Sequence, residues 1–332
     1  MVSPLSIYHI LSLTANGAAN KTLEEMLKVL CQKDKKELNA CNKSIYSVIE
    51  KYVTTEIANA VFTRFYPLEG FMKIVKEYKA KVEPLKDAEQ VNKWCSNATH
   101  EKIPKIIDTL NDNDLMVLIN AIYFKGEWEK SFNKNQTFKE PFWNFNKDKK
   151  ETDFMHLTQN FDYFENDNLQ VISLNYQKDN LKALIILPKK EEDINSYIKG
   201  LTLDKYNEIT NNLLNKKVIL SLPKFEINFG DELKPYFIAM GMVEAFGKAD
   251  FSEMKKENDI HIGRIIHKTF IKIDEQGTEA AAATAVVMRK FVMARPEPTP
   301  VMNVNHPFLF IIRANNLPAG HDMLFVSKIE SL

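Results

Sequence analysis

The sequence predicts an α+β fold in a single domain that spans residues 1–332. Two observations support the mixed class: some segments carry apolar residues at helical spacing, and others carry the alternating or continuous apolar runs of strands. A third observation concerns organisation, because no internal repeat and no low-complexity linker divides the chain. Hydrophobic residues make up 45% of the chain, which is enough for a large core.

The first part of the chain carries helical patterns. Pro4 can begin a helix, and the apolar residues that follow give it a broad buried surface. Thr22-Leu23-Glu24-Glu25 has the capping pattern, so a second helix is expected to begin at Thr22. Further helices are predicted at Ile45–Tyr52, Leu68–Tyr78, Gln90–Ile107 with Trp94 pointing inward, and Glu232–Met240, where Phe237 and Met240 share a face.

Strand patterns lie between and after these helices. Residues 116–124 are nearly all apolar, as in a strand that is covered on both faces, but Asn120 interrupts the run. A buried amide must find hydrogen-bond partners, so Asn120 is either a satisfied core residue or part of a polar gate. The other predicted strands are Leu169–Tyr176, Leu181–Leu187, Val218–Leu222, Lys268–Ile273, Phe308–Ile312 and Met323–Val326.

The stretch from Asp274 to Val287 is unusual because it combines a glycine with a run of small residues. After Gly277, only Glu279 is charged until Arg289, and residues 280–283 are four alanines. Helix propensity favours a helix over residues 280–285. The alternative is a strand whose uncharged face could slide between two existing strands, with Gly277 as a pivot free of the positive-φ penalty.

Composition excludes several partners and cofactors. Lys and Arg together number 44, as do Asp and Glu, so no net charge directs the chain to nucleic acid or to an acidic membrane. Cys31, Cys41 and Cys95 lack metal-ligand spacing and are expected to be free thiols. We predict no metal and no cofactor. No phosphate loop, zinc motif or nucleophile elbow occurs, so we also predict that the protein is not an enzyme.

Five blocks spread along the chain resemble the serpins. They are Ser3-Pro4-Leu5-Ser6, Asn120 to Trp128, Leu222-Pro223-Lys224-Phe225, His267 with the stretch that follows it, and Asn305-His306-Pro307-Phe308-Leu309-Phe310. The resemblance is to inhibitory serpins, similar to the leaderless ovalbumin-like members. It implies a large central mixed β-sheet, two further sheets, about eight helices and an exposed reactive-centre loop at residues 275–302. Residues 56–62 would form a strand of the main sheet.

The resemblance also assigns roles to residues. The hinge of the reactive loop would be Glu275, Gly277, Thr278, Glu279, Ala280, Ala281, Ala282 and Ala283. Ser3, Ser6, Asn120 and His267 match the shutter, a hydrogen-bonded cluster beneath the point where strands of the main sheet part. Trp128 matches the breach, where the loop first enters the sheet. The family's first helix would be missing or truncated here, or the N-terminus incomplete.

The resemblance implies suicide inhibition of a serine protease by a monomer, through a covalent acyl complex. Seventeen residues from Glu275 through Phe291 give the usual spacing to the cleaved bond, so Phe291-Val292 is expected and Met293-Ala294 is the alternative. Either bond suits chymotrypsin-like or cathepsin G-like proteases. The alternatives are a non-inhibitory carrier or chaperone, or an inhibitor of a trypsin-like or cysteine protease. Without a visible signal peptide, a cytoplasmic or leaderless-secreted, extracellular location is expected.

Overall fold

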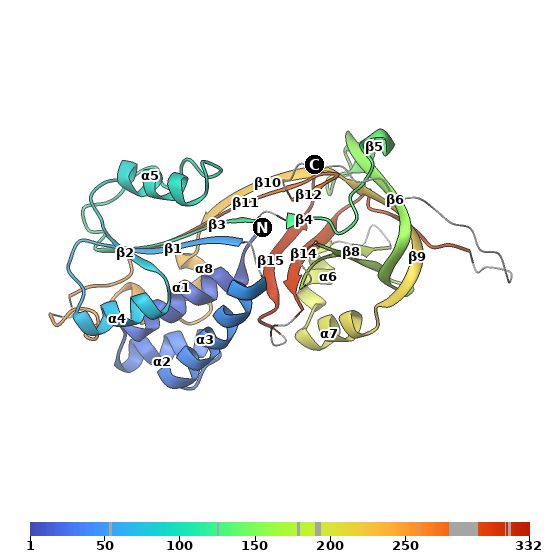
Figure 1. Cartoon of the computed structure of the whole chain (residues 1–332). Coiled ribbons are helices and arrows are strands. Elements are labelled where there is room, and N and C mark those ends of the chain that lie inside the picture. Colours follow the sequence, from blue (N-terminus) through green and yellow to red (C-terminus); the bar gives the residue numbers. More distant parts are fainter. Residues whose placement is uncertain are drawn as a thin grey trace. The chain divides into compact units, whose positions relative to one another are not determined.

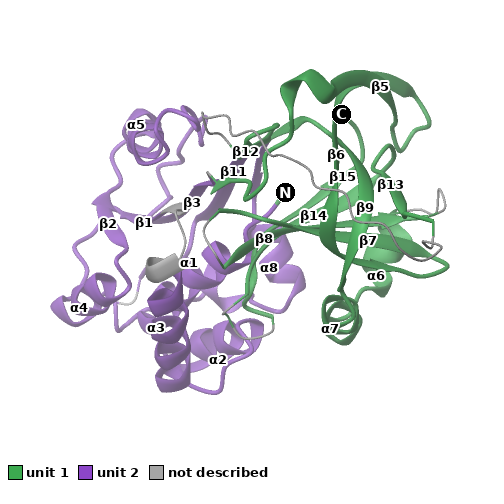
Figure 2. Ribbon diagram, turned by 45° about the vertical axis from the view of Figure 1, so that its right-hand side comes forward, with its two compact units in different colours: residues 1, 125–227, 271–332 green, residues 2–124, 228–270 purple. Residues whose placement is uncertain are grey.

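The computed structural model describes residues 1–52, 55–124, 126–177, 180–189, 194–257, 259–278, 298–315, 317 and 320–332 (Figure 1). These residues hold eight α-helices and three β-sheets, which confirms the predicted α+β class. The chain divides into two compact units, coloured separately in Figure 2. One unit comprises residues 2–124 and 228–270, and the other comprises Met1, residues 125–227 and residues 271–332.

A mixed five-stranded sheet runs in the order β10-β11-β3-β1-β2. Strand β3 is antiparallel to β1 and parallel to β11, and β1 is parallel to β2. Every residue of β3 is buried, as its continuous apolar pattern predicts. The strands are β1 (Thr55–Thr63), β2 (Lys81–Pro84), β3 (Met116–Phe124), β10 (Phe225–Glu232) and β11 (Arg264–Ile273).

The helices of the unit with residues 2–124 pack around a core shared with this sheet. Helix α1 begins at Pro4, as predicted, and its apolar face packs with Met116 and Leu118 of β3. The Ser3 hydroxyl caps this helix by accepting a bond from the Ser6 N–H at 3.4 Å. The helices are α1 (Pro4–Asn16), α2 (Asn20–Val29), α3 (Lys35–Tyr52), α4 (Glu69–Glu77), α5 (Ala88–Ala98) and α8 (Lys234–Ala239).

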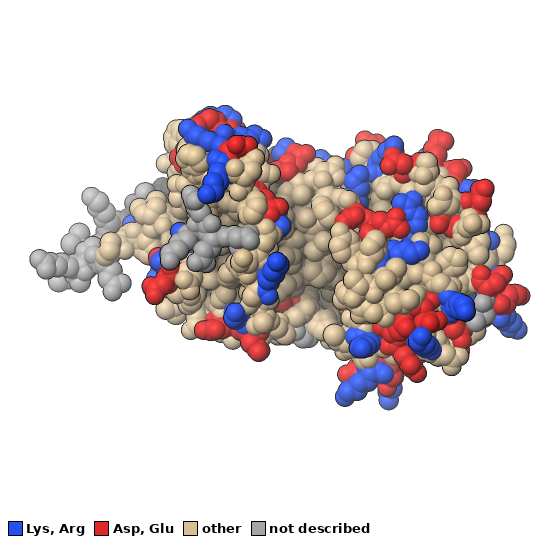
Figure 3. Space-filling model, turned by 180° about the vertical axis from the view of Figure 1, so that it is seen from behind, with Lys and Arg blue, Asp and Glu red and all other residues tan. Residues whose placement is uncertain are grey.

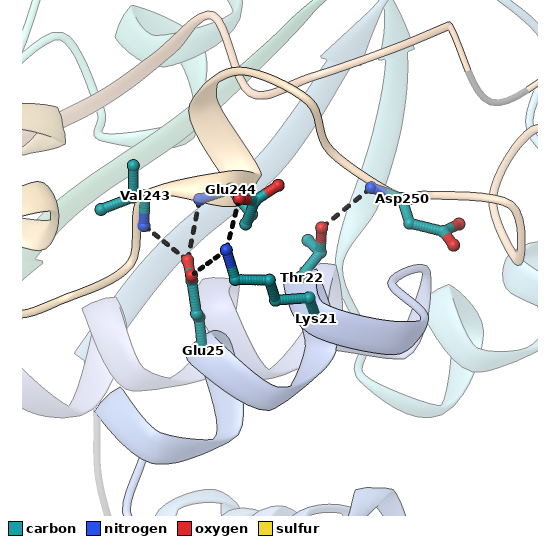
Figure 4. A network of polar contacts seen from close by, with 6 residues as sticks. All are labelled: Lys21, Thr22, Glu25, Val243, Glu244 and Asp250. Atoms are coloured by element: carbon teal, nitrogen blue, oxygen red, sulfur yellow. Dashed lines mark hydrogen bonds and ion pairs between the residues drawn. The ribbon is translucent and has the colours of Figure 1, made fainter.

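The predicted cap of the second helix is wrong. Helix α2 begins at Asn20, and Thr22 is buried within its first turn. The Thr22 hydroxyl instead accepts a bond from the Asp250 N–H at 2.8 Å (Figure 4). Glu25 accepts bonds from the N–H groups of Val243 and Glu244 at 2.7 and 2.8 Å. These side chains therefore satisfy the backbone of a distant segment rather than their own helix.

Two other helix predictions need correction. Helix α5 ends at Ala98 rather than near Ile107, because His100 and Glu101 adopt positive φ and the chain leaves the helical path. Helix α8 ends at Ala239. Phe237 is buried but Met240 is 57% exposed, so these two residues do not share a buried face.

The other unit contains an eight-stranded sheet in the order β13-β9-β6-β7-β8-β14-β15, with β5 paired to β6. Helices α6 (Ile194–Gly200) and α7 (Leu203–Asn211) pack on it through a cluster that includes Ile194 and Tyr206. A two-stranded ladder joins β4 (Gly126–Glu127) to β12 (Gly277–Thr278). The strands are β5 (Thr137–Trp143), β6 (Lys149–Glu165), β7 (Leu169–Asn175), β8 (Leu181–Pro188), β9 (Leu214–Pro223), β13 (Val301–Asn303), β14 (Phe308–Ala314) and β15 (Met323–Ile329).

The surface and the cysteines bear on the predictions from composition. Figure 3 shows basic and acidic side chains intermixed over the visible face. None of the helices in the described ranges is both long enough and apolar enough to cross a membrane. None of the three cysteines, all of which lie in the described residues, forms a disulfide bond, and Cys95 is buried.

The Glu25 contacts give a prediction about stability. Replacing Glu25 with Ala removes both acceptor bonds and leaves two backbone N–H groups without their carboxylate partner. We expect a loss of about 1–3 kcal/mol in the free energy of unfolding, measured by urea denaturation. The matched control is Glu24→Ala, which removes an exposed carboxylate from the same helix. Equal losses in both variants would contradict the role given to Glu25.

Candidate functional site

A polar cluster joins three strands of the five-stranded sheet to the start of α1. Asn59 of β1, Asn120 of β3 and His267 of β11 lie opposite one another in register. The Asn120 amide nitrogen donates to the Ser6 hydroxyl and to the Asn59 side-chain oxygen. The Ser3 N–H donates to Nε2 of His267 at 3.1 Å. The structure thus brings together the four predicted shutter residues.

His267 is held in a neutral state with a defined tautomer. Because Nε2 accepts the bond from Ser3, Nδ1 carries the proton and donates to the Asn120 side-chain oxygen. Burial lowers the pKa of His267 to about 3, because the charged imidazolium would lose its hydration. The ring therefore links β3 to β11 at neutral pH without carrying a buried charge.

Asn59 is a member of this cluster that the sequence analysis missed. Its side chain is 6% exposed, and its oxygen accepts bonds from both Ser6 and Asn120. Asn59 interrupts an apolar strand in the same way that Asn120 does. That signal could have identified it, because buried amides in neighbouring strands can satisfy one another.

Trp128 anchors the chain segment that follows β11. Its indole ring is 1% exposed and stacks on Tyr176, with ring centroids 4.5 Å apart. The indole N–H donates to the Asp274 carbonyl at 3.0 Å, and the Trp128 backbone N–H donates to the Gln276 carbonyl at 2.9 Å. The residue predicted for the breach is therefore in contact with the start of the predicted loop.

A tight turn reverses the chain immediately after β11. The Asp274 N–H donates to the Gly277 carbonyl at 2.9 Å, and the Gly277 N–H donates back to Asp274 at 3.2 Å. Gly277 has φ +135°, and a Cβ there would lie 2.2 Å from the Gly126 carbonyl oxygen. Both the conformation and the close approach require glycine, which agrees with the prediction that this position needs a residue free of the positive-φ penalty.

The two described hinge residues beside the pivot are buried. Thr278 is fully buried, pairs with Gly126, and its hydroxyl lies 3.2 Å from the Tyr176 hydroxyl. The Glu275 carboxylate accepts bonds from Thr137 at 2.8 Å and from Lys224 at 3.1 Å. Burial alone would raise the pKa of Glu275, but these bonds and one from its own backbone hold it below the ordinary value.

A serine, a histidine and a glutamate also meet in the eight-stranded sheet. Nε2 of His156 lies 3.1 Å from the Ser221 hydroxyl and 2.8 Å from the Glu140 carboxylate, while Nδ1 contacts the Gln136 carbonyl. In a catalytic triad the serine and the carboxylate contact opposite ring nitrogens. Here both contact the same nitrogen, so the cluster lacks triad geometry.

The remaining predicted site residues lie outside the described part of the chain. This applies to the rest of the hinge and to both candidate cleavage bonds. The residues are Glu279, Ala280, Ala281, Ala282, Ala283, Phe291, Val292, Met293 and Ala294. The choice between helix and strand for residues 280–285 also falls outside the described residues.

The buried neutral His267 gives a prediction about acid stability. Its pKa is lower in the folded state, so between about pH 6.5 and 3 the unfolded chain binds a proton that the folded chain does not. Its contribution to stability is complete above pH 6.5 and falls by up to about 1.4 kcal/mol per pH unit below it. We expect His267→Gln to reduce that slope in urea unfolding measured across this range.

The control for this measurement is His261→Gln, which replaces a partly exposed histidine in the same unit. His9 is also buried, and burial lowers its pKa to about 4, so part of the slope remains in the His267 variant. A slope that is identical in the wild type and in His267→Gln would contradict the neutral, buried assignment.

The comparisons with known proteins cover nearly the whole chain. The family model for serpins, described as serine protease inhibitors, matches residues 1–331. Leukocyte elastase inhibitor of Xenopus laevis is 35% identical over 99% of this chain and 92% of its own length. Human serpin B8 is 33% identical over 94% of this chain and 88% of its own length.

Solved structures give the same result. Tengpin, a thermophilic serpin in its native state, is 31% identical with a TM-score of 0.89, over 100% of this chain and 88% of that chain. Human thyroxine-binding globulin is 25% identical with a TM-score of 0.90, over 99% of this chain and 91% of that chain. The family match, the sequence relatives and the fold all indicate one family. The chain belongs to the serpin family of serine protease inhibitors.

Proposed function

We propose that this chain is a suicide inhibitor of chymotrypsin-like or cathepsin G-like serine proteases. The protease attacks a bond in residues 275–302 and forms an acyl-enzyme. The cut loop then inserts between β3 and β11 as a new strand, carries the protease with it and distorts the protease active site before deacylation. Loop insertion of this kind is a known property of serpins.

The observation that carries this proposal is the direction of three chain segments. Strands β3 and β11 are neighbours and run parallel over seven residue pairs, from Arg264↔Val117 to Phe270↔Tyr123. The turn at Asp274–Gly277 already reverses the chain after β11. A strand that continues from this turn would be antiparallel to both neighbours, so one parallel ladder would be replaced by two antiparallel ladders.

The energetics favour insertion once the loop is cut. Antiparallel pairing is slightly more stable per residue than parallel pairing. About a dozen new backbone hydrogen bonds would contribute on the order of 1 kcal/mol each. Opening the sheet costs the bond between Asn120 and His267 and the parallel ladder. Apart from Glu279, the residues from Thr278 to Ala283 have small side chains. The gain can exceed the few kcal/mol needed to deform an active site.

The protease class rests on the sequence of the loop. Phe291 fits the apolar primary pocket of a chymotrypsin-like protease, where burial of an aromatic ring contributes about 2–3 kcal/mol. Met293 suits the same pocket. Arg289 and Lys290 would attract trypsin-like proteases but leave a shorter tether, and Arg295 precedes Pro296. Similarity to a leukocyte elastase inhibitor supports a serine protease as the partner.

The proposal includes a 1:1 covalent complex formed by a monomer. The similarity to serpin B8 supports a cytoplasmic or leaderless-secreted location. The second candidate is a carrier without inhibitory activity, because thyroxine-binding globulin, solved as a complex with thyroxine, shares the fold. The run of four alanines in the hinge favours inhibition, since a non-inhibitory hinge has no need of small side chains.

Incubation with chymotrypsin and with cathepsin G tests the proposal. We expect a protease adduct that survives boiling in SDS. Clean cleavage of the loop without an adduct would favour the carrier. An adduct with trypsin alone would keep the mechanism but replace the protease class.

The buried hinge residue Thr278 gives a prediction about inhibition. We expect Thr278→Arg to abolish the SDS-stable adduct while the loop remains cleavable, because Thr278 is already fully buried in the uncut protein and an unpaired charge there would push out the segment from which insertion has to start. The matched control is Thr299→Arg, which lies after both candidate bonds and outside the part that inserts. Adducts that persist at the wild-type level in Thr278→Arg would contradict insertion through this hinge.

The position of the cleaved bond gives a separate prediction. Mass spectrometry of the C-terminal fragment released on complex formation should show a first residue of Val292. A fragment that begins at Ala294 would move the bond to Met293-Ala294. A fragment that begins at Lys290 or Phe291 would exclude both bonds and indicate a trypsin-like protease.

A further inference from the structure

The outward face of three neighbouring strands carries exposed apolar side chains beside the point where the chain returns from the reactive loop. Strands β13, β9 and β6 lie side by side, and Val301, Ile219 and Thr158 lie opposite one another in register. The exposed fractions of Val301 and Ile219 are 58% and 40%. Their face points away from the core, because Val218 and Leu220, which flank Ile219 along β9, are fully buried on the other face.

The same face continues across β6 to β5. His156 and Ser221 form the next row along β6 and β9, because each lies two residues from a member of the first row. Nε2 of His156 lies 3.1 Å from the Ser221 hydroxyl, and the ring centroids of His156 and Phe138 are 5.6 Å apart. Phe138 belongs to β5 and is 56% exposed. We call this surface the outer face, and it consists of Phe138, His156, Thr158, Ile219 and Val301.

The outer face differs in composition from most sheet surfaces that face solvent, which alternate polar side chains outward with apolar ones inward. Phe138, Ile219 and Val301 are large apolar residues, and solvent reaches all three. The row beyond them is polar, because Asn160 pairs with Lys217 and both are exposed. An apolar centre with a polar rim is the composition of a protein–protein interface. A partner that covered the three apolar side chains would gain free energy from their burial.

The end of the reactive loop indicates which partner covers this face. The Ile219 N–H donates to the Pro300 carbonyl at 2.9 Å, so the chain that returns from the loop is fixed to β9. Nine residues, 292–300, join the predicted Phe291-Val292 bond to this point, and they span at most about 30 Å. A folded domain of about 200 residues has a radius of gyration of about 16 Å, and hence a width of about 40 Å. A protease bound at Phe291-Val292 is therefore wider than its tether is long, which brings the outer face within its reach.

We propose that the outer face is a second contact surface for the protease that attacks the reactive loop. The identity of the partner, a chymotrypsin-like serine protease, rests on the proposed function. The protease surface beside its active-site cleft covers Ile219, Val301 and Phe138 while the cleft holds the loop. This contact strengthens binding before the bond is cut. Because it involves no residue of the primary pocket, it discriminates among proteases that share the same pocket.

Binding to inactivated proteases tests the proposal without requiring inhibition. The probes are chymotrypsin and cathepsin G, each with its active-site serine replaced by alanine, so that they bind the loop but form no acyl-enzyme. Surface plasmon resonance gives the Kd of the full chain for each probe. We expect Ile219→Thr and Phe138→Thr each to raise the Kd for at least one probe by about fivefold or more, because each removes apolar surface from the contact. Threonine is chosen because it favours the strand conformation.

The matched control is Leu214→Thr. Leu214 is 60% exposed and lies in β9 as Ile219 does, but the two residues are five positions apart and therefore point to opposite faces of the sheet. We expect this control to bind both probes with the Kd of the wild type. Phe138→Thr changes a different strand, so it tests the outer face even if Ile219→Thr folds poorly.

Wild-type Kd values in both Ile219→Thr and Phe138→Thr would overturn the proposal, and so would the absence of binding between the wild type and either probe. A wild-type dimer in analytical ultracentrifugation that Ile219→Thr dissociates, with protease binding unchanged, would assign the outer face to a second copy of this chain instead. Failure of the proposed function gives a different result. Active proteases would then form no SDS-stable adduct, while Ile219→Thr would still weaken binding of the inactivated ones.

Discussion

The structure depends on the contact between β3 and β11. These strands run side by side in parallel, and a side-chain hydrogen bond joins Asn120 to His267 across them. Ser3, which caps α1, and Asn59 of β1 complete the cluster. Under the proposed mechanism, the contact has to hold the sheet closed in the intact protein and yet be weak enough to open. A few neutral hydrogen bonds at about 1 kcal/mol each meet both requirements.

The turn after β11 sets the direction in which the chain continues. Gly277 adopts a conformation that is strained for any other residue, and Trp128 binds the carbonyls of Asp274 and Gln276. The reversal of the chain after β11 is therefore already present in the uncut protein. Ion pairing of Glu275 with Lys224 fixes the outer side of the turn. Under the proposed mechanism, a cut loop would continue along a path that the residues up to Thr278 already define.

Much of this could be predicted from the sequence. Continuous apolar runs identified β3, β8 and β14, and local chemistry identified the start of α1 and the positive φ of Gly277. The failures have physical causes. Glu25 was placed in a capping pattern from the local sequence alone. Its partners, Val243 and Glu244, lie some 218 residues away and leave no local signal. Helix α5 ends at two non-glycine residues with positive φ, which no propensity scale indicates. The long strand β6 is rich in polar residues and was not predicted.

The central claim is that this sheet accepts a sixth strand when the loop is cut. The most direct measurement is the thermal unfolding midpoint before and after cleavage within residues 289–294 by a protease that is then removed. Insertion predicts a large rise in the midpoint, because the sheet exchanges one parallel ladder for two antiparallel ladders. An unchanged midpoint after complete cleavage would contradict the account.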